Sequence, residues 1–446
     1  MQARTIGVVS AGAVVVLAGR CLGQGAWELV SSPSPGATVN SLRAVSAVSA
    51  GEAWAVGASG GTVTLPLVLR FDGAWAAVAP PSFRGMGINP SLIACAASPA
   101  GTLWLGGDVD DQNPLTSNRP VFARRSGSGW VVSAATLRPQ SEYPYGARGG
   151  SVADLCVISD SDVWAVGHAN GFGDGLGTGV TMALHFDGST WTDVPMPNPA
   201  NRTTYVTGVK GFSSSNVWAV GYGLSNGQPW RGFVFRWNGS AWSTVSNPAT
   251  DGFDTYLRCI DGVAPDDLWA AGKTGSAPLF MHYDGSSWSV VPGPVSASSA
   301  TVTRLVALAS DDVWAATALP SVYYHWNGSV WSEVQPGAVP TAASRVVNAL
   351  TRVPGGGAWA VGNWSNGTKS FTLTERLVAA PACGTSDFNG DGDAGTDQDI
   401  EAFFACLGGS CCAWCYAGGA DFNGDGDTGT DQDIESFFRV LGGGSC

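Results

Sequence analysis

Residues 26–379 consist of short runs rich in apolar residues, and each run is bounded by glycine, asparagine, aspartate or serine. Runs of this length between turn residues are typical of β-strands. The stretch 205–246 contains four of them: 205–212, 217–221, 232–237 and 241–246. An Asn-Gly pair separates the last two, and such pairs supply the φ > 0 residues that two-residue hairpins require. The pattern therefore predicts a four-stranded antiparallel unit.

This unit is repeated along the chain. The string Asp-Val-Trp-Ala-Val-Gly at 162–167 recurs with small changes around six other tryptophans: Trp54, Trp104, Trp218, Trp269, Trp314 and Trp359. The intervals between copies are 50, 60, 54, 51, 45 and 45 residues. A second string that ends in a tryptophan, such as 186–191, follows six of the seven copies. Four strands in a unit of this size indicate a β-propeller blade, so the copies predict an all-β, seven-bladed propeller.

The two ends of the repeat region complement each other. The seventh unit runs through Trp359 and 371–377 and then stops without its final tryptophan strand. An isolated copy of that strand, Ala-Trp-Glu-Leu-Val, lies at 26–30 and matches the sequences at 191–195 and 288–292. We expect this N-terminal strand to complete the last blade, which leaves no open junction in the ring. On these motifs, residues 26–379 resemble kelch-like and other secreted bacterial β-propellers.

A second type of pattern occupies the C-terminal end. Asp387-Phe-Asn-Gly-Asp-Gly-Asp recurs 34 residues later, beginning at Asp421. Oxygen ligands at positions 1, 3 and 5 with glycine at 6 are what an EF-hand calcium loop needs. Apolar residues then follow at i, i+3, i+4 and i+7, which predicts a short amphipathic helix after each loop. They are Ile400, Phe403, Phe404 and Leu407 in the first copy and Ile434, Phe437, Phe438 and Leu441 in the second.

The carboxylate that closes each calcium loop is ambiguous in the sequence. Position 12 is Gln398 in the first loop and Gln432 in the second, with aspartates on both sides. We assign the closing role to the following aspartate, because the apolar helix pattern begins directly after it; the preceding aspartates, Asp397 and Asp431, are the alternative, as ligands or helix caps. The predicted ligands of two Ca²⁺ ions are Asp387, Asn389, Asp391, Asp393 and Asp399, and Asp421, Asn423, Asp425, Asp427 and Asp433.

The duplicated loop–helix unit resembles a dockerin module of the cysteine-bearing type found in exported proteins of planctomycete-like bacteria. The resemblance covers about 65 residues and implies a small α-helical, EF-hand-type domain. It also implies attachment to a cohesin-like partner or to a cell-surface component. The missing acidic residue at position 12 is the departure from the pattern of the family.

Charge separates the two regions. The chain carries 22 basic and 35 acidic residues, a formal net charge of −13, but residues 380–446 alone hold 12 acidic residues and one basic residue. The preceding part then has 21 basic and 23 acidic residues, a net of −2. Such a balance argues against nucleic-acid binding, which needs a basic face. It gives no indication of the ligand of the propeller.

The N-terminus is typical of an export signal. Arg4 precedes an apolar run of 14 residues from Ile6 to Gly19, which is too short to span a bilayer. Cys21 suggests a lipoprotein alternative, but Arg20 before it does not suit that processing. The predicted organisation is a signal peptide at 1–25, the propeller at 26–379, a linker at 380–386 and the dockerin-like module at 387–446. We expect an exported protein without a membrane span after signal removal, located outside the cell, on its surface or in the periplasm.

The ten cysteines support an oxidising compartment. Six lie in the C-terminal region and predict disulfides that staple a small domain, with the pairing left open. The spacing from Cys412 to Cys415 also matches a redox motif, although no βαβ pattern surrounds it. Cys95, Cys156 and Cys259 are interpreted as small buried apolar residues of the propeller.

The candidate ligand face comes from loop lengths. The longest connections follow the second and fourth strands of the units, so they share one face of the disc, mainly at blades 2 to 4. Fourteen of the 19 tryptophans keep two fixed registers and are predicted to be core, whereas Trp230 and Trp364 fall in predicted loops. The candidate contacts for a glycan or protein ligand are Asp110, Arg119, Glu142, Tyr143, Tyr145, Arg148, Arg202, Trp230, Arg231 and Trp364.

Catalytic signals are weak. The chain has no HExxH, no GxSxG and no phosphate loop. One strand position of the repeat carries Arg70, Arg236, His185, His282 and His325, so these histidines are interpreted as repeat features. The aspartates before the inner tryptophans, as at 311–312, are predicted to hydrogen-bond backbone amides. Glu142 with a loop aspartate would form a glycosidase-type carboxylate pair.

Two functional hypotheses follow. The first is an exported, non-catalytic binding protein whose propeller recognises a glycan or a protein and whose calcium module anchors it. The second is a propeller enzyme, a glycoside hydrolase or lyase, that acts on polysaccharide and is carried by the same module. Retention of a glycan without turnover distinguishes the first from the second.

Overall fold

The computed structural model describes residues 26–112, 118–142, 149–170, 179–200, 203–225, 227–248, 254–294, 300–317, 320–337, 339, 344–378, 386–412, 419–423 and 428–442. The predicted signal peptide, 1–25, lies outside these residues, as does all of the predicted linker except Ser386. The chain forms two compact units, and the larger one extends from Gly25 to Ala379. None of the described helices is long and apolar enough to cross a membrane.

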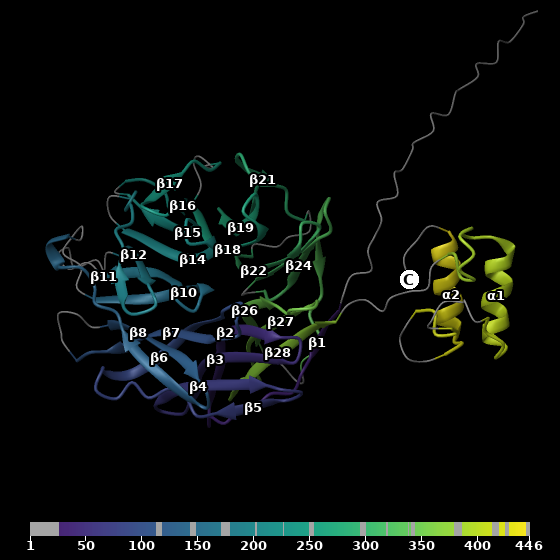
Figure 1. The fold of residues 1–446 in the computed structure, drawn as a ribbon, viewed down its shortest axis with the longest axis horizontal. Helices are drawn as coiled ribbons and strands as arrows, with labels where there is room; N and C mark the ends of the chain where they lie inside the picture. Colours follow the sequence, from purple (N-terminus) through teal and green to yellow (C-terminus); the bar gives the residue numbers. More distant parts are fainter. Residues whose placement is uncertain are drawn as a thin grey trace, which may run out of the picture. The chain divides into compact units, whose positions relative to one another are not determined.

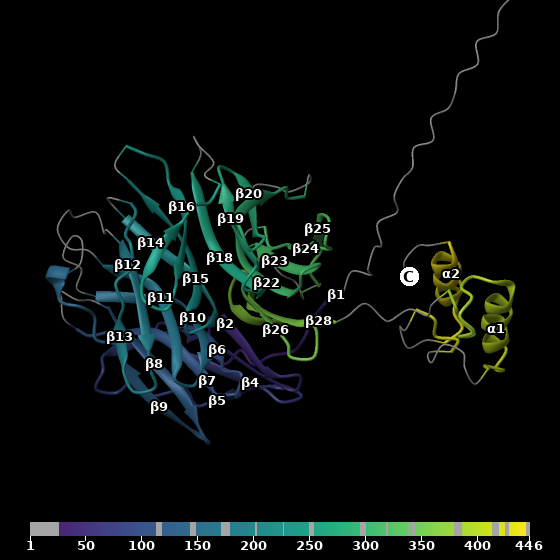
Figure 2. The same cartoon turned by 45° about the horizontal axis from the view of Figure 1, so that its top comes forward.

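The larger unit is a seven-bladed β-propeller of four-stranded antiparallel sheets (Figures 1 and 2). We number the blades in chain order and letter their strands a to d from the centre outward. Blades 1 to 3 comprise β2 (Val39–Ser49), β3 (Glu52–Gly60), β4 (Thr64–Phe71) and β5 (Trp75–Val78); β6 (Ile88–Ala97), β7 (Leu103–Asp110), β8 (Asn118–Ser126) and β9 (Gly129–Ala134); and β10 (Gly149–Ser159), β11 (Asp162–Asn170), β12 (Gly179–Phe186) and β13 (Trp191–Asp193).

Blades 4 to 6 repeat this order. They comprise β14 (Thr203–Ser213), β15 (Asn216–Leu224), β16 (Arg231–Trp237) and β17 (Trp242–Val245); β18 (Thr255–Ala264), β19 (Asp267–Thr274), β20 (Ala277–Tyr283) and β21 (Trp288–Val291); and β22 (Val302–Ala309), β23 (Asp312–Thr317), β24 (Tyr323–Trp326) and β25 (Trp331–Val334). The four strands predicted between 205 and 246 are therefore those of blade 4.

The seventh blade joins the two ends of the propeller. It contains β26 (Ser344–Arg352), β27 (Ala358–Ser365) and β28 (Ser370–Val378), and its fourth strand is β1 (Ala26–Leu29). Strand β1 pairs antiparallel with β28, with Trp27 opposite Leu377. The predicted closure by the N-terminal strand is confirmed, as is the count of seven blades.

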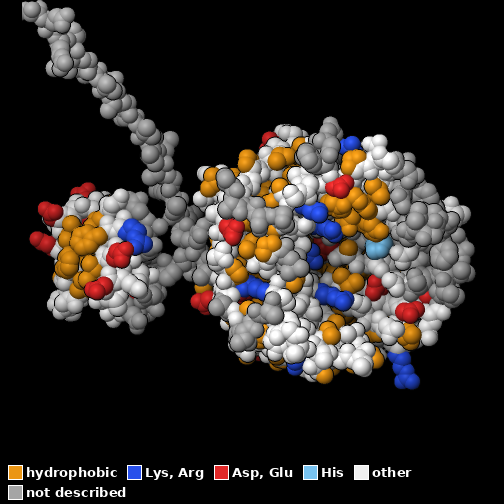
Figure 3. All heavy atoms as spheres, turned by 180° about the vertical axis from the view of Figure 1, so that it is seen from behind, with side chains coloured by type: hydrophobic (Ala, Val, Ile, Leu, Met, Phe, Trp, Pro, Cys, Tyr) orange, Lys and Arg blue, Asp and Glu red, His pale blue; other side chains and the backbone are white. Residues whose placement is uncertain are grey.

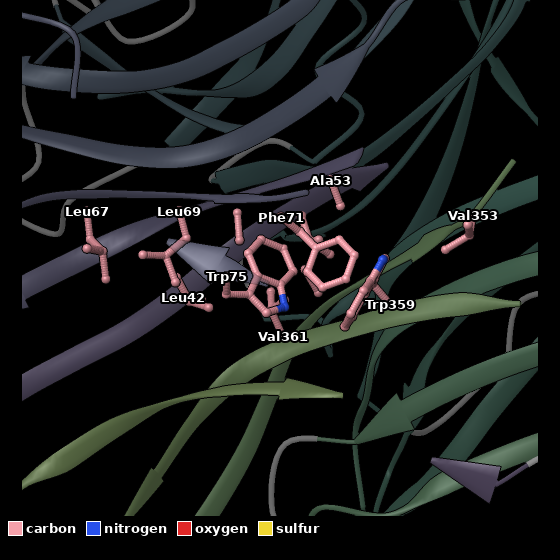
Figure 4. Close-up of a cluster of buried hydrophobic side chains, with 12 residues drawn as sticks. Leu42, Ala53, Leu67, Leu69, Phe71, Trp75, Val353, Trp359 and Val361 are labelled. Atoms are coloured by element: carbon pink, nitrogen blue, oxygen red, sulfur yellow. The ribbon is translucent and has the colours of Figure 1, made fainter. Parts of the chain in front are cut away.

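Tryptophans connect each blade to the one before it. The tryptophan that begins or lies near the start of strand d packs edge-on against the strand b tryptophan of the preceding blade. The ring centroids are 5.2 Å apart for Trp75 and Trp359, 6.0 Å for Trp130 and Trp54, 5.9 Å for Trp191 and Trp104, 5.3 Å for Trp242 and Trp164, 6.0 Å for Trp288 and Trp218, 5.3 Å for Trp331 and Trp269, and 5.6 Å for Trp27 and Trp314. The junction of blades 1 and 7 is shown in Figure 4.

An arginine or histidine side chain of strand c lies over each strand b tryptophan. These side chains are Arg70, Arg124, His185, Arg236, His282, His325 and Arg376. The three histidines accordingly occupy a repeat position, as predicted. Where strand b begins with an acidic residue, its carboxylate contacts this side chain: Asp162 contacts His185 at 2.9 Å, and Glu52 contacts Arg70 at 2.9 Å. Asp162 and Asp312 accept hydrogen bonds from side chains, and not from backbone amides as predicted.

Six of the seven inner tryptophans are followed three residues later by a glycine, and this glycine has a structural cause. At Gly57, Gly107 and Gly221, a Cβ atom would lie 2.0 Å or less from a backbone carbonyl oxygen of strand a, so the close approach of the two strands there requires glycine. Strand a bulges directly after this point in all seven blades, including blade 6, where the position is Thr317. The bulge matters for the site, because it changes which strand a side chains face the centre of the ring.

The C-terminal unit is a pair of short helices, α1 (Asp397–Leu407) and α2 (Asp431–Leu441). Its core is four fully buried phenylalanines: Phe388, Phe403, Phe422 and Phe437. Phe404 and Phe438, which the periodicity placed on the same apolar faces, are each 46% exposed. A disulfide links Cys406 to Cys411, and Cys412 is disulfide-bonded as well. The predicted use of cysteines as staples is thus confirmed at Cys406 and Cys411.

Candidate functional site

The first strands of all seven blades line a central cavity of about 400 Å³. Strand a begins, strand b ends and strand c begins on one side of the ring. We call this side the loop face, because it carries the long connections that follow strands b and d. It is the face on which the sequence predicts the ligand. The bulge residues Arg43, Ile93, Ala153, Thr207 and Arg258 line the cavity from this side.

Four aromatic side chains meet on the loop face at blades 4 and 5. We call Tyr205, Tyr222, Trp230 and Tyr256 the aromatic cluster. The ring centroid of Tyr222 lies 5.5 Å from that of Tyr205, 5.4 Å from that of Trp230 and 5.0 Å from that of Tyr256. The Trp230 and Tyr256 rings are 5.5 Å apart. All four side chains are half-buried, so the cluster is packed against the propeller and also exposed to solvent.

The fold fixes each ring of the cluster. Tyr205 on β14 and Tyr222 on β15 are direct cross-strand partners, and Tyr256 lies near the start of the neighbouring strand β18. Trp230 precedes β16 and is held by its main chain. Its N–H donates to the Asp254 carboxylate at 2.9 Å, and its carbonyl accepts from the Thr255 N–H at 2.8 Å. A connection of blade 4 is thereby fixed to the first strand of blade 5.

Cationic side chains border the cluster. The Arg258 guanidinium lies 4.5 Å from the Tyr222 ring centroid and donates to the Tyr222 hydroxyl at 3.1 Å. The Lys273 ammonium lies 4.9 Å from the Tyr256 ring centroid. Cation–π contacts of this kind orient the long side chains along the aromatic surface. The cluster therefore offers ring faces and positive charge to one ligand.

Three other titratable side chains of this surface, His168, Tyr205 and Tyr256, are neutral near pH 7. Burial lowers the pKa of His168, whose ring lies edge-on to Tyr205 with centroids 4.9 Å apart. Burial also raises the pKa values of Tyr205 and Tyr256 above the ordinary tyrosine value. The phenol groups thus remain protonated and can both donate and accept hydrogen bonds.

The structure brings only part of the predicted face together. Trp230 belongs to the aromatic cluster, and Arg231 begins β16 directly after it. Asp110 and Arg119 lie in blade 2, near the end of β7 and the start of β8. Tyr143, Tyr145, Arg148 and Arg202 are outside the described residues.

The structure corrects one other prediction. Trp364 lies in strand β27 and not in a loop, and its ring stacks on Phe371 with centroids 4.3 Å apart. It does not join the aromatic cluster. Glu142 ends a short 3₁₀ helix, Gln140–Glu142, where it is exposed. Burial, and to a smaller extent the charge of Glu142, raise the pKa of Asp193. The glycosidase-type pair at Glu142 stays a prediction.

Sequence reasoning missed Tyr205, Tyr222, Tyr256, Arg258 and Lys273. A signal for two of them exists in the repeat. The residue after the string varies from blade to blade, whereas the string itself shows only small changes. This position, four residues after the inner tryptophan, holds Ala58, Asp108, His168, Tyr222, Lys273, Ala318 and Asn363. Variation at a fixed position on the loop face indicates recognition and not packing.

The cavity is lined by charged residues. They are Arg43, Lys210, Arg258, Arg304 and Arg352, with Asp154 and Asp261. Figure 3 shows one face of the propeller, on which Lys and Arg side chains gather about the middle of the disc beside hydrophobic side chains. Cys259 is buried in a core cluster, as predicted, and Cys95 and Cys156 are partly buried against core clusters; all three also line this cavity. Burial raises the pKa of each thiol, to about 11 for Cys156, so the thiols stay protonated.

The two carboxylates of the cavity have different environments. Asp261 forms an ion pair with Lys210 at 2.5 Å and accepts the Ala307 N–H at 2.9 Å. Asp154 accepts two backbone N–H groups, from Leu155 and Val209, each at 2.9 Å. Burial raises the pKa of Asp154 to about 6, although these hydrogen bonds and the charge of Arg304 act in the opposite direction.

The first acidic loop of the C-terminal unit folds around its own backbone. The Asp387 carboxylate accepts the Gly392 N–H at 3.1 Å, and the Asn389 side-chain oxygen accepts the Asp391 N–H at 2.9 Å. Gly390, Gly392 and Gly395 have φ values of 72°, 95° and 75°, which favour glycine. Oxygen-bearing side chains on alternate residues of such a loop suit a hard cation.

Asp399 and Asp433 cap helices. Both are fully buried at the third position of their helices, where each accepts the main-chain N–H of the N-cap threonine at 2.8 Å. Burial alone raises the pKa of Asp399, but hydrogen bonds from Thr396 and Asn389 outweigh it, and the pKa falls below its ordinary value. No three His, Cys, Asp or Glu side chains are grouped as a metal site within the described part of the chain. Asp425 and Asp427 lie outside that part.

Comparison with known proteins gives only distant similarities. No protein-family model and no curated protein sequence matches the chain. Among solved structures, YCF48 bound to a D1 peptide is 13% identical, with 80% of this chain and 97% of that chain covered and a TM-score of 0.49. An ulvan lyase bound to -[GlcA(1-4)Rha3S]- is 9% identical over 79% and 94% of the two chains, with a TM-score of 0.49. The α-L-arabinanase of Penicillium chrysogenum is 12% identical over 79% and 97%, with a TM-score of 0.43.

Proposed function

We propose that this chain is an exported, non-catalytic binding protein whose propeller recognises a glycan through the aromatic cluster. The observation that supports this most directly is the half-buried group of Tyr205, Tyr222, Trp230 and Tyr256 on the loop face. Rigid aromatic rings with polar edges bind hydroxyl-bearing rings through stacking and hydrogen bonds at low cost in side-chain entropy. A protein ligand is the less favoured alternative.

The structural role of the Asp254 carboxylate favours binding over catalysis. Asp254, beside the cluster, accepts the main-chain N–H of Trp230 and so positions the loop. A glycosidase needs two carboxyl groups on opposite sides of one sugar ring. No such pair flanks the aromatic cluster in the described residues. The propeller enzyme remains the competing function, and turnover is its readout.

Replacing Trp230 by alanine is expected to weaken glycan binding by about 2 kcal/mol, or about thirtyfold, as for other buried aromatic contacts at interfaces. The main chain of residue 230 makes the bonds to Asp254 and Thr255, so alanine retains them. The measurement is retardation of the full chain in native gels that contain xylan, dextran, polygalacturonate or dextran sulfate.

Trp364→Ala is the matched control, because Trp364 stacks on Phe371 in blade 7 and is not part of the cluster. It should retain wild-type retardation. Equal retardation of wild type and Trp230→Ala on every polysaccharide would contradict the proposed site. Release of reducing ends or unsaturated products during the same incubations would favour the enzyme.

We also propose that the C-terminal unit binds two Ca²⁺ ions and attaches the propeller to a cohesin-like protein or a cell-surface component. The residues that would hold the ions are the predicted ligands of the two loops. Their side-chain oxygens, the glycine-rich loop conformation and the net charge of this region all suit a hard divalent cation. The bound ion would neutralise carboxylates that otherwise repel each other within a few residues.

The full chain is expected to bind two Ca²⁺ ions in isothermal titration calorimetry, and Asp391→Ala should reduce this to one. Asp391 is exposed at position 5 of the first loop, so its loss removes a ligand without disturbing the phenylalanine core. Glu401→Ala, which removes an exposed carboxylate from α1, should still bind two. Absence of Ca²⁺ binding by the wild type, or two ions bound by Asp391→Ala, would refute the assignment.

A further inference from the structure

The central cavity concentrates positive charge in a nearly neutral propeller. Five of the charged residues that line it are basic and two are acidic, a net of +3. Residues 1–379 together have a net charge of −2. The positive charge of the cavity is therefore a local feature and does not follow from composition.

None of the four arginines of this cavity forms an ion pair with a carboxylate among the described residues. Arg258 donates to the Tyr222 hydroxyl at 3.1 Å, Arg304 to the Thr303 carbonyl at 2.7 Å, Arg43 to the Ser91 hydroxyl at 2.5 Å, and Arg352 to the Ala307 carbonyl at 3.1 Å. By contrast, Lys210 in the same cavity is paired with Asp261.

Arg258 carries the strongest indication of a missing partner. Its Nε–H group is buried and has no acceptor among the described residues. A guanidinium presents several N–H donors in a rigid plane, and leaving them unpaired away from water is costly. An anionic group with two oxygens satisfies such donors in pairs.

Arg258 connects the central cavity to the aromatic cluster. Arg258 belongs to both, since it lines the cavity and lies against the rings of Tyr222 and Tyr256, 4.5 and 5.7 Å from their centroids. Arg304 lies one blade further, just after the corresponding bulge of β22. We propose, on the basis of the glycan-binding function above, that the ligand is an acidic polysaccharide, with its carboxylate or sulfate bound by Arg258 and Arg304 and a neighbouring sugar stacked on the aromatic cluster.

A glycan fits this surface better than an acidic peptide does. The cavity mouth is polar, and the adjoining cluster adds three phenol hydroxyls, of which those of Tyr205 and Tyr256 have raised pKa values. These groups suit hydroxyl-rich rings, whereas apolar peptide side chains would leave them without partners. Polyglutamate is therefore a discriminating probe, because it carries the same anionic group without sugar rings.

The position of Asp154 in the cavity predicts that binding of the acidic ligand depends on pH. Asp154 lies at the level of Arg304 in the cavity, and the charged or titratable groups that act on it or respond to it are Arg304, Asp261 and the thiols of Cys95, Cys156 and Cys259; Lys210 is paired with Asp261. Above its pKa of about 6, the ionised carboxylate competes with a bound anion for the positive charge of Arg304. Protonation below pH 6 removes this competition and should strengthen binding of an anion that stays ionised.

The test measures binding of the full chain to polygalacturonate, dextran sulfate, dextran and polyglutamate by isothermal titration calorimetry and native gels. At least one acidic polysaccharide should bind about tenfold or more tightly than dextran, and added NaCl should remove the difference. Arg258→Gln and Arg304→Gln should each weaken that binding by about tenfold or more. Arg84→Gln is the matched control, since Arg84 is exposed outside the cavity.

The outcomes are distinct. Preference for polygalacturonate identifies a carboxylate ligand, and preference for dextran sulfate identifies a sulfated one. Stronger dextran sulfate binding at pH 5 than at pH 7.5, abolished by Asp154→Asn, supports the site in the cavity. Among the residues that the structure describes, Arg304 contacts no aromatic ring, so its variant remains informative if Arg258→Gln disturbs Tyr222.

Equal, Trp230-dependent binding of dextran and acidic polysaccharides would overturn this inference and leave the proposed glycan-binding function intact. Preferential binding of polyglutamate, or arginine variants that bind acidic polysaccharides like the wild type, would also overturn it. Binding of none of the polysaccharides would overturn both proposals.

Discussion

Replacing Trp27 by alanine is expected to lower the free energy of unfolding of the propeller by about 3 to 5 kcal/mol, the usual cost of deleting a buried aromatic side chain. Trp27 is 3% exposed, stacks on Tyr323 with ring centroids 4.4 Å apart, and packs edge-on against Trp314. Its strand, β1, has only four residues and pairs with β28 alone. This one side chain therefore provides much of the packing energy that holds the closing strand in the last blade.

The measurement is the melting temperature of the full chain by calorimetry or circular dichroism at one fixed scan rate. Trp130→Ala is the matched control, because Trp130 has the corresponding role in blade 2 but is only half-buried and lies within a blade that is continuous in sequence. Trp130→Ala should lower the melting temperature clearly less than Trp27→Ala does. If the melting temperature of Trp27→Ala equals or exceeds that of Trp130→Ala, the closing strand does not have the proposed energetic role.

The repeat made the architecture predictable. Each string contains an apolar strand, a tryptophan and turn residues in fixed order, and these local features agree with the global fold. The isolated strand around Trp27 even indicated how the ring closes. The one misplaced element, Trp364, shows the limit of the method: a residue outside the tryptophan registers was taken for a loop residue, but it extends strand β27 and stacks on Phe371.

The site was less predictable because it forms between blades. Tyr222 and Tyr256 belong to different blades, and their contact depends on the angle between two sheets, which no local pattern encodes. Arg258 reaches the central cavity because strand a bulges at that residue. Gly272 is paired with the residue directly before the bulge, but this relation becomes visible only when the two strands are paired. The sequence indicated the correct face and Trp230, but not the residues around it.

The two helices of the C-terminal unit have similar caps. Both have a capping box, formed by Thr396 with Asp399 in α1 and by Thr430 with Asp433 in α2. The sequence assigned the loop-closing role to Asp399 and Asp433 and gave Asp397 and Asp431 as the alternative, as ligands or as helix caps. The structure assigns the cap to Asp399 and Asp433, because they stand three residues after the N-cap threonine. Their role as calcium ligands stays a prediction.

Replacing Arg345 by methionine is expected to destabilise the propeller by about 3 to 5 kcal/mol, because it leaves a buried carboxylate without its partner. Glu375 is fully buried and Arg345 is 8% exposed. The two form an ion pair, and the Tyr323 hydroxyl donates to the same Glu375 oxygen at 2.6 Å. Tyr323 also stacks on Trp27, so this polar network lies directly beneath the closing strand.

The double variant Arg345→Met, Glu375→Leu distinguishes the cost of an unpaired charge from the value of the pair. It removes both charges, and we expect it to recover most of the loss in melting temperature, since apolar replacements of buried ion pairs are often neutral. The single variant should also depend on pH. Burial already raises the pKa of Glu375, and loss of Arg345 removes an interaction that opposes this rise. A carboxyl whose pKa is higher in the folded state binds its proton more tightly there, so the variant should be most stable at low pH and lose stability as the pH rises through that pKa. A double variant no more stable than Arg345→Met would show that the network acts through its hydrogen-bond geometry and not through charge compensation.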